Sequence, residues 1–94
     1  MNRIYQALSD PTRRKILQLL RQREMTAGEI ASHFPQAKAT LSRHFSVLKE
    51  ADLIQGEKRG TTITYRLNVS VLEEALLSLM ESFRITSHGE EDRT

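Results

Sequence analysis

Apolar residues recur every three or four positions along most of the chain, which is the spacing of amphipathic helices. Between residues 53 and 67 the period falls to two, which is typical of a β-hairpin. The pattern therefore predicts a mainly α protein with one hairpin. The expected helices cover residues 2–8, 11–22, 26–34 and 36–52, and a last helix runs from residue 68 or 70 to about 86.

Local signals predict where the second and third helices begin. Asp10 is a good N-cap, and Pro11 stands at the first helical position, where its missing N–H costs nothing. Thr26 and Glu29 form a capping box at the start of the third helix. This helix ends before Pro35, so a turn of three or four residues is expected before the fourth helix.

Three cations, Arg13, Arg14 and Lys15, occupy the first turn of the second helix. The positive end of the helix dipole disfavours cations at this place. Either a nearby anion offsets them, or they form a solvated cluster.

The helix at residues 36–52 has two different sides. Leu41, Phe45 and Leu48 fall on one narrow apolar stripe. The opposite side is small, hydroxylated and basic, and it consists of Ala39, Ser42, Arg43 and Ser46. The major groove of DNA admits a helix of this kind and offers acceptors to Arg, Ser and Thr side chains. Together with the short helix before it, this stretch forms a helix-turn-helix pattern.

The predicted hairpin has one apolar face and a basic tip. Ile63, Tyr65 and Leu67 alternate with polar residues, and residues 58–61, Lys-Arg-Gly-Thr, predict the turn. After a helix-turn-helix, such a hairpin is a wing.

The last helix is apolar around roughly half of its circumference, whereas packing on one core needs a stripe of only about 100°. Ser70 and Glu73 predict a second capping box at its start. The surplus apolar surface predicts another neighbour, most simply the same helix of a second subunit. Residues 1–86 are expected to form one domain, and the polar residues 87–94 a disordered tail.

Composition adds limits to this picture. With 94 residues, of which 38% are hydrophobic, the chain is one small domain that a partner subunit would help to stabilise. It has no cysteine, which excludes disulfides and thiolate metal sites. No signal peptide and no apolar run of about 18 residues occur, so we expect a cytoplasmic protein without membrane insertion.

The charge is distributed unevenly. Residues 1–68 hold 12 Lys and Arg against 6 Asp and Glu, which gives +6, and residues 69–94 hold 2 against 6, which gives −4; the two parts add to the net +2. A basic body with an acidic end suggests that one face meets a polyanion.

Four segments together resemble the ArsR/SmtB family of bacterial winged-helix repressors, and they are ALSDPTRRKILQLL (7–20), MTAGEIA (25–31), LSRHFSVLKEADLI (41–54) and KRGTTITYRLN (58–68). The resemblance implies the topology α-α-α-α-β-β-α and a homodimer joined through the first and last helices. It also implies binding to an imperfect palindrome, usually in the protein's own promoter, and release by an inducer. Within the family the chain is most similar to the small, metal-independent branch represented by the sporulation-delaying repressor of bacilli.

The chain departs from the metal-sensing members of this family in two places. Residues 24–26, Glu-Met-Thr, stand where those members carry a cysteine motif, and the last helix offers only Glu73, Glu74 and Glu81. We therefore expect neither a metal nor another cofactor. In addition, Ala37 stands where the family often has a Ser or Asn cap, which costs a typical helix about 1 kcal/mol.

The helix-turn-helix supplies most of the predicted DNA contacts. Arg43, at the centre of the exposed face, is the best candidate for base readout through guanine O6 and N7. Ala39 allows close approach, and Thr40, Ser42 and Ser46 flank Arg43 and bond to bases or phosphates. Gln36 and Lys38 are expected to contact phosphate, as are Thr26 and Ala27 through backbone N–H groups at a helix N-terminus. His44 is included in the set, although its position favours a packed histidine over a base contact. A solvated side chain is the alternative for each.

Two further groups complete the expected sites. Lys58 and Arg59 at the hairpin tip would reach a minor groove or the DNA backbone, with a solvated turn as the alternative. The expected dimer interface consists of Ile4, Leu8, Leu72, Leu76, Leu79, Met80 and Phe83.

The predicted function is a sequence-specific DNA-binding regulator, most simply a homodimeric repressor of a palindromic operator, with autorepression as one possibility. The alternative is a winged-helix protein-interaction module that has lost DNA binding. An enzyme is excluded because no catalytic motif occurs. The inducer stays open between a partner protein, a small molecule and no inducer at all.

Overall fold

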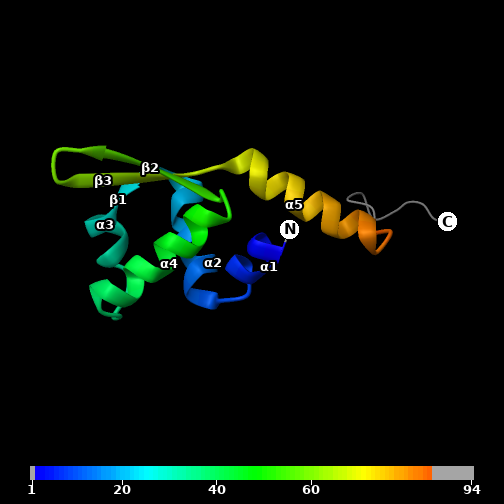
Figure 1. Ribbon diagram of the computed structural model, residues 1–94, viewed down its shortest axis with the longest axis horizontal. Coiled ribbons are helices and arrows are strands. Elements are labelled where there is room, and N and C mark those ends of the chain that lie inside the picture. The colour runs from blue at the N-terminus through cyan, green and yellow to red at the C-terminus, as the bar shows by residue number, and fades with distance from the viewer. Residues whose placement is uncertain (1, 86–94) are drawn as a thin grey trace.

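The computed structural model describes residues 2–85 (Figure 1). Its elements follow the order α1 (Asn2–Leu8), α2 (Pro11–Gln22), β1 (Met25–Thr26), α3 (Ala27–Ala31), α4 (Lys38–Glu50), β2 (Ile54–Arg59), β3 (Thr62–Leu67) and α5 (Val69–Ser82). The order of helices and hairpin confirms the expected winged helix-turn-helix class. The expected tail at residues 87–94 lies outside the described residues.

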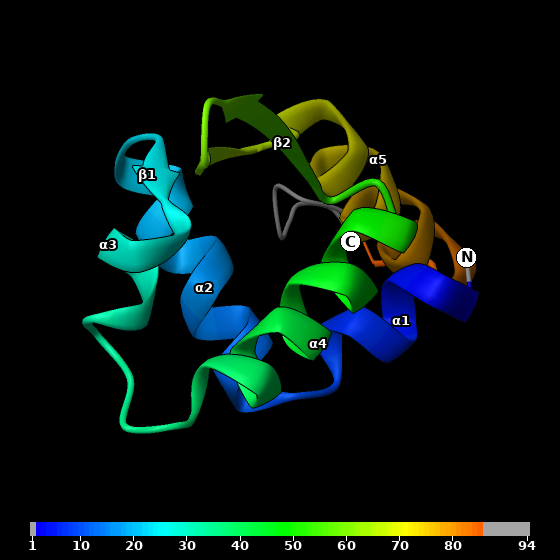
Figure 2. The ribbon, with the colours of Figure 1, turned by 60° about the vertical axis from the view of Figure 1, so that its left-hand side comes forward.

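The core lies where α2, α3, α4 and the hairpin meet. Figure 2 shows α1, α2 and α4 below strand β2 of the hairpin. The apolar stripe of α4 is buried as expected, with Leu41 and Leu48 at 1% and 0% exposure. Burying one such side chain contributes about 1.5–3 kcal/mol. The largest fully buried side chains are Ile16, Ile30, Leu41, Leu48 and Leu53.

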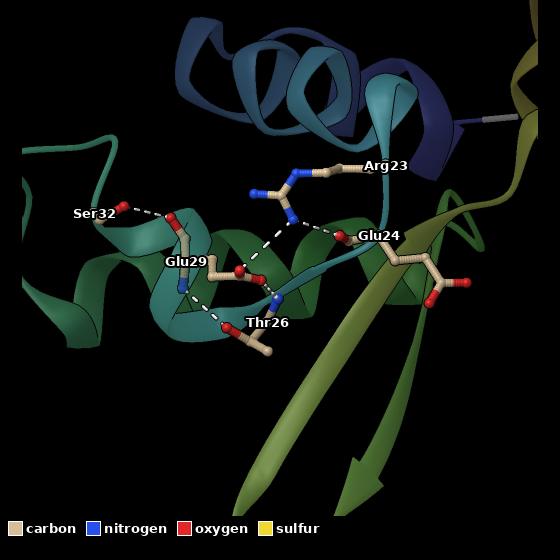
Figure 3. Close-up of polar contacts among 5 residues, drawn as sticks. All are labelled: Arg23, Glu24, Thr26, Glu29 and Ser32. Atoms are coloured by element: carbon tan, nitrogen blue, oxygen red, sulfur yellow. Dashed lines mark hydrogen bonds and ion pairs between the residues drawn. The ribbon is translucent and has the colours of Figure 1, made fainter.

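The predicted starts of α2 and α3 are confirmed. Asp10 Oδ2 accepts a hydrogen bond of 3.1 Å from the backbone N–H of Arg13. Thr26 and Glu29 form the capping box, with bonds of 2.8 and 3.0 Å that exchange side-chain oxygens and backbone N–H groups (Figure 3). The bond from the Thr26 N–H lowers the pKa of Glu29 below its ordinary value.

The second capping box is not formed. Helix α5 begins at Val69 after Asn68, so Ser70 lies inside the first turn, and its hydroxyl donates to Asn68 Oδ1 at 3.3 Å. The backbone N–H of Asn68 donates to the Leu53 carbonyl at 2.9 Å. This bond ties the end of β3 to the residue before β2, and the chain turns into α5 two residues earlier than a Ser70 cap requires.

Two turns also differ from the prediction. The connection between α3 and α4 spans residues 32–37 and is longer than expected, because α3 ends at Ala31 and not just before Pro35. His33 and Phe34 follow the helix as a hydrogen-bonded turn. In the hairpin, Lys58 and Arg59 belong to β2, and only Gly60 and Thr61 connect the strands. Gly60 has a φ of 62°, a left-handed conformation that suits a two-residue hairpin turn.

A short strand, β1, was not expected from the sequence. It pairs antiparallel with β3, with Met25 opposite Tyr65 and Thr26 opposite Thr64, which gives a three-stranded sheet in the order β1-β3-β2. Two residues are too few to show a period of two. This pairing holds the start of α3 against the wing.

Helix α5 extends away from the other elements (Figure 1). The structure is therefore elongated, with extents of 54 × 21 × 20 Å. Only Ala75 of this helix is buried, whereas Leu76, Leu77 and Phe83 are 44%, 56% and 69% exposed. Within residues 2–85 no helix has the length and apolar character needed to cross a membrane.

Two glycines should respond in opposite ways to alanine. A Cβ on Gly56 would lie 2.9 Å from Cε1 of Tyr65, a buried ring that packs on Phe45 with centroids 4.8 Å apart. Gly56→Ala should therefore lower the free energy of unfolding by about 1–3 kcal/mol.

The matched variant is Gly28→Ala. Gly28 lies in helix α3, and a Cβ there would meet only Thr26 Oγ1, at 3.9 Å. It should raise the free energy of unfolding by about 0.5–1 kcal/mol. Urea unfolding followed by circular dichroism measures both. Equal changes in the two variants would contradict the close packing of Tyr65 on Gly56.

Candidate nucleic-acid interface

The outer side of α4 is exposed along its whole length. Ala39, Ser42, Arg43 and Ser46 are exposed, as are Lys38 before them and Lys49 after them, while Thr40 is half-buried. Within residues 2–85 no acidic side chain pairs with Arg43. The helix therefore offers one guanidinium among small hydroxylated neighbours, a surface that can enter a groove without steric obstruction.

The first turn of α4 has no side-chain cap. Ala37 has extended backbone angles, as an N-cap requires, but its methyl group accepts no hydrogen bond from the helix. The backbone N–H groups of residues 38–40 are consequently without an intrahelical partner. These groups favour an anion such as a phosphate at this end of the helix.

The start of α3 is less open than the sequence suggested. The backbone N–H of Thr26 already donates to Glu29 Oε1, and Arg23 Nη1 lies 3.6 Å from the other oxygen of that carboxylate (Figure 3). Of the two donors of Thr26, only its hydroxyl proton is left to meet a phosphate.

Two of the predicted contact residues face α2. Nε2 of Gln36 donates to Thr12 Oγ1 at 3.0 Å, and its Oε1 is buried without a partner. His44 is half-buried, and its Nδ1 lies 3.1 Å from Nη1 of Arg13. The preference for a packed His44 thus fits the structure, although its partner is a side chain of another helix.

The wing presents its two cations on opposite faces. Lys58 pairs with Ile63 and Arg59 with Thr62, so alternation puts their side chains on different sides of the hairpin. Arg59 also bonds to Glu57 Oε1 at 3.1 Å, and both side chains are exposed. A surface pair of this kind is weak, and DNA can displace it.

Two of the three cations at the start of α2 are bonded to the end of α1. Arg13 and Arg14 donate to backbone carbonyls at the end of α1, at 2.9 Å to Ala7, 2.9 Å to Gln6 and 2.7 Å to Leu8. These carbonyls carry the negative end of the α1 dipole. The sequence left open whether a nearby anion offsets these cations or whether they form a solvated cluster. For Arg13 and Arg14, the carbonyls of α1 provide the offsetting negative charge.

The described residues also contain no group of three or more His, Cys, Asp or Glu side chains close enough to hold a metal ion.

Comparison with known proteins agrees with this geometry. A family described as a helix-turn-helix domain matches residues 8–57. The transcriptional repressor SdpR of Bacillus subtilis is 47% identical over 76 residues, which cover 81% of this chain and 84% of that protein. The arsenical resistance operon repressor of Staphylococcus xylosus is 36% identical over 73 residues, which cover 78% and 70%.

Solved structures show the same fold. A possible transcriptional regulator for arsenical resistance has a TM-score of 0.76 at 38% identity, covering 86% of this chain and 83% of that one. An ArsR family transcriptional regulator, RHA00566, has a TM-score of 0.75 at 29% identity, covering 92% of both chains.

The fold and the exposed side of α4 define a winged helix-turn-helix DNA-binding protein. The chain belongs to the ArsR/SmtB family of winged-helix transcriptional repressors. Its function is thus DNA-binding transcriptional regulation and not catalysis.

The uncapped start of α4 leads to a test. In the free protein, the amides of Lys38, Ala39 and Thr40 should exchange with solvent quickly, because these N–H groups lack partners. Ala37→Ser supplies a hydroxyl at a position with suitable backbone angles, so it should raise the free energy of unfolding by roughly 0.5–2 kcal/mol.

Hydrogen exchange followed by NMR measures the protection, and thermal unfolding measures the stability. Strong protection of these amides in the parent protein would show that the turn is already ordered without a cap.

Proposed function

We propose that the protein is a homodimeric repressor that binds an imperfect palindrome, with α4 of each subunit in successive major grooves. Two such helices must lie one helical turn of DNA apart, about 34 Å. The observation that carries the proposal is the unpartnered apolar side of α5.

The exposed part of α5 is too apolar for a solvated helix. Leu76, Leu77 and Phe83 are each more than two-fifths exposed, and Val69 is 46% exposed. A contiguous apolar surface of this kind marks an interaction site. A second copy fits it well, because a two-fold axis lets the same patch cover itself.

The proposed interface combines α5 with α1. Ile4 and Leu8 are half-buried on α1, and a shallow apolar pocket of about 410 Å³ lies between Leu8, Leu17, Leu67, Leu72 and Leu76. Leu79, Met80 and Phe83 continue this surface along α5. We assign these residues to the contact between subunits.

The contacts with DNA divide into two kinds. Arg43 reads a base edge, and Ser42 and Ser46 add hydrogen bonds beside it. Lys38, Thr40 and the first-turn N–H groups of α4 bind phosphate, as do the two wing cations, Lys58 and Arg59. The side chains of Gln36 and His44 are hydrogen-bonded to residues of α2, so we place these two residues at the rim of the contact with DNA.

The regulated gene and the signal are further proposals. We propose that the operator lies upstream of the protein's own gene, and that an inducer, a partner protein or a small molecule, releases it. Because the protein acts on DNA, we place it in the cytoplasm.

The salt dependence of binding to the DNA upstream of the protein's own gene tests the proposed repressor function. The logarithm of the binding constant should fall steeply with the logarithm of salt, by roughly 0.9 per phosphate contacted. A flat profile at micromolar protein would instead favour an interaction module that does not bind DNA.

Arg43→Ala and Lys58→Ala should separate base reading from phosphate binding. Arg43→Ala should reduce the preference for operator over random DNA by about 1–3 kcal/mol, because a bidentate contact with guanine is lost. Lys58→Ala should weaken binding to both DNAs equally and reduce the salt slope by about one.

Fluorescence anisotropy on the two DNAs measures both effects, and each variant is the control for the other. Equal losses on operator and random DNA in both variants would refute the assigned roles.

Leu76→Glu should produce monomers that hold the operator at least about tenfold more weakly. A charge in the subunit contact loses apolar burial and leaves an unpaired carboxylate. The fold of the monomer should change little, because Leu76 is 44% exposed in the single chain.

Ser78→Glu is the matched control, since it adds the same charge to an exposed position on the other side of α5. Sedimentation velocity distinguishes monomer from dimer. An unchanged dimer in Leu76→Glu would show that the interface lies elsewhere.

A further inference from the structure

Two side-chain hydrogen bonds join the first turn of α2 to α4, the proposed DNA-reading helix, and to the turn before it. Thr12 Oγ1 accepts from Gln36 Nε2 at 3.0 Å, and Arg13 Nη1 bonds to His44 Nδ1 at 3.1 Å. They join residues 24 and 31 positions apart, the longest separations of any side-chain hydrogen bond within residues 2–85. One of them reaches the turn before α4, and the other reaches α4 itself.

The Arg13 side chain is held from several directions. Its Nε donates to the Ala7 carbonyl and its Nη2 to the Gln6 carbonyl, both at 2.9 Å. The guanidinium is a rigid planar fork, so these two bonds to the end of α1 fix the direction of Nη1. The backbone N–H of Arg13 is bonded to Asp10, the N-cap of α2.

The chemistry of the third bond fixes the state of His44. A guanidinium can only donate, so His44 Nδ1 must accept, and the imidazole is the neutral tautomer with its hydrogen on Nε2. His44 is adjacent to Arg43 on α4. Through the bonds of Arg13, the imidazole of His44 on α4 is linked to α2 and to the end of α1.

We propose that Arg13 is a positioning residue for DNA recognition: by holding His44 from the end of α1, it sets the rotation of α4 and hence the direction of Arg43. The inference rests on the proposed function, in which α4 reads DNA and α1 belongs to the subunit contact. Arg13 then transmits the geometry of the dimer to each reading helix.

Arg14 provides a matched comparison. It lies in the same turn, carries the same charge and also donates to the end of α1, at 2.7 Å to the Leu8 carbonyl. Within residues 2–85 it has no hydrogen bond to α4. Arg13→Gln and Arg14→Gln therefore remove the same charge, but only the first removes a bond to the reading helix.

The experiment compares Arg13→Gln, Arg14→Gln, His44→Ala and the double variant Arg13→Gln/His44→Ala in full-length protein. Binding is measured on operator and on random DNA at several salt concentrations, and sedimentation checks the dimer. Arg13→Gln should weaken operator binding about tenfold more than Arg14→Gln does. Its affinity for random DNA and its salt slope should match those of Arg14→Gln. In the His44→Ala background, Arg13→Gln should weaken operator binding no more than Arg14→Gln does in the parent protein.

A direct phosphate contact by Arg13 would give a different result, namely equal losses on both DNAs and a salt slope smaller by about one. That result would overturn the proposal, as would additive effects of the two substitutions. If Arg13→Gln does not fold, Arg13→Lys and Arg14→Lys replace the two glutamine variants in the same comparison. Both keep the charge, but only Arg13→Lys loses the fork that holds α1 and His44 together.

A separate measurement on the free protein needs no DNA. Imidazole nitrogen NMR should show His44 as the Nε2–H tautomer in the parent protein and a mixture of tautomers in Arg13→Gln. An unchanged tautomer would remove the basis for the positioning role. Failure of the parent protein to bind any operator would instead refute the proposed function and leave this tautomer result standing.

Discussion

The structure depends on burying one side of α4 while leaving the other side free. Leu41, Phe45 and Leu48 bind the helix to the core, and Phe45 also packs against Tyr65 of the wing. Tyr65 can approach this closely because its strand neighbour is Gly56, which has no side chain. The reading helix and the wing are thus fixed to each other by apolar packing. Polar residues on the outer side of α4 are then free to serve recognition.

The sequence predicted those parts of the fold that have strong local signals. Asp10 with Pro11 and Thr26 with Glu29 satisfy backbone groups within a few residues, so their structural roles can be deduced from spacing alone. The α4 stripe was predictable for the same reason, since one helical period defines it. The Ser70 and Glu73 pair shows the limit: the motif is present, but a backbone bond from Asn68 to distant Leu53 places the helix start elsewhere.

The site was less predictable than the fold. The exposed residues of α4 follow from helical geometry, but the partners of Gln36 and His44 are Thr12 and Arg13, which no local pattern connects with them. Strand β1 was missed because two residues carry no periodic signal, and its pairing with β3 is a tertiary contact. Signals of this kind arise only when segments far apart in the chain meet, so a single sequence cannot show them.

The exposed side of α5 has a consequence for how the protein would respond to its own abundance. In the proposed dimer, this helix is covered only when two chains meet, so the amount of DNA-binding species varies with the square of the concentration of free chains when dimers are scarce. Repression would then begin over a narrow range of expression level. Single chains would meanwhile carry an open apolar helix, which offers proteases and chaperones a means of recognising unassembled repressor.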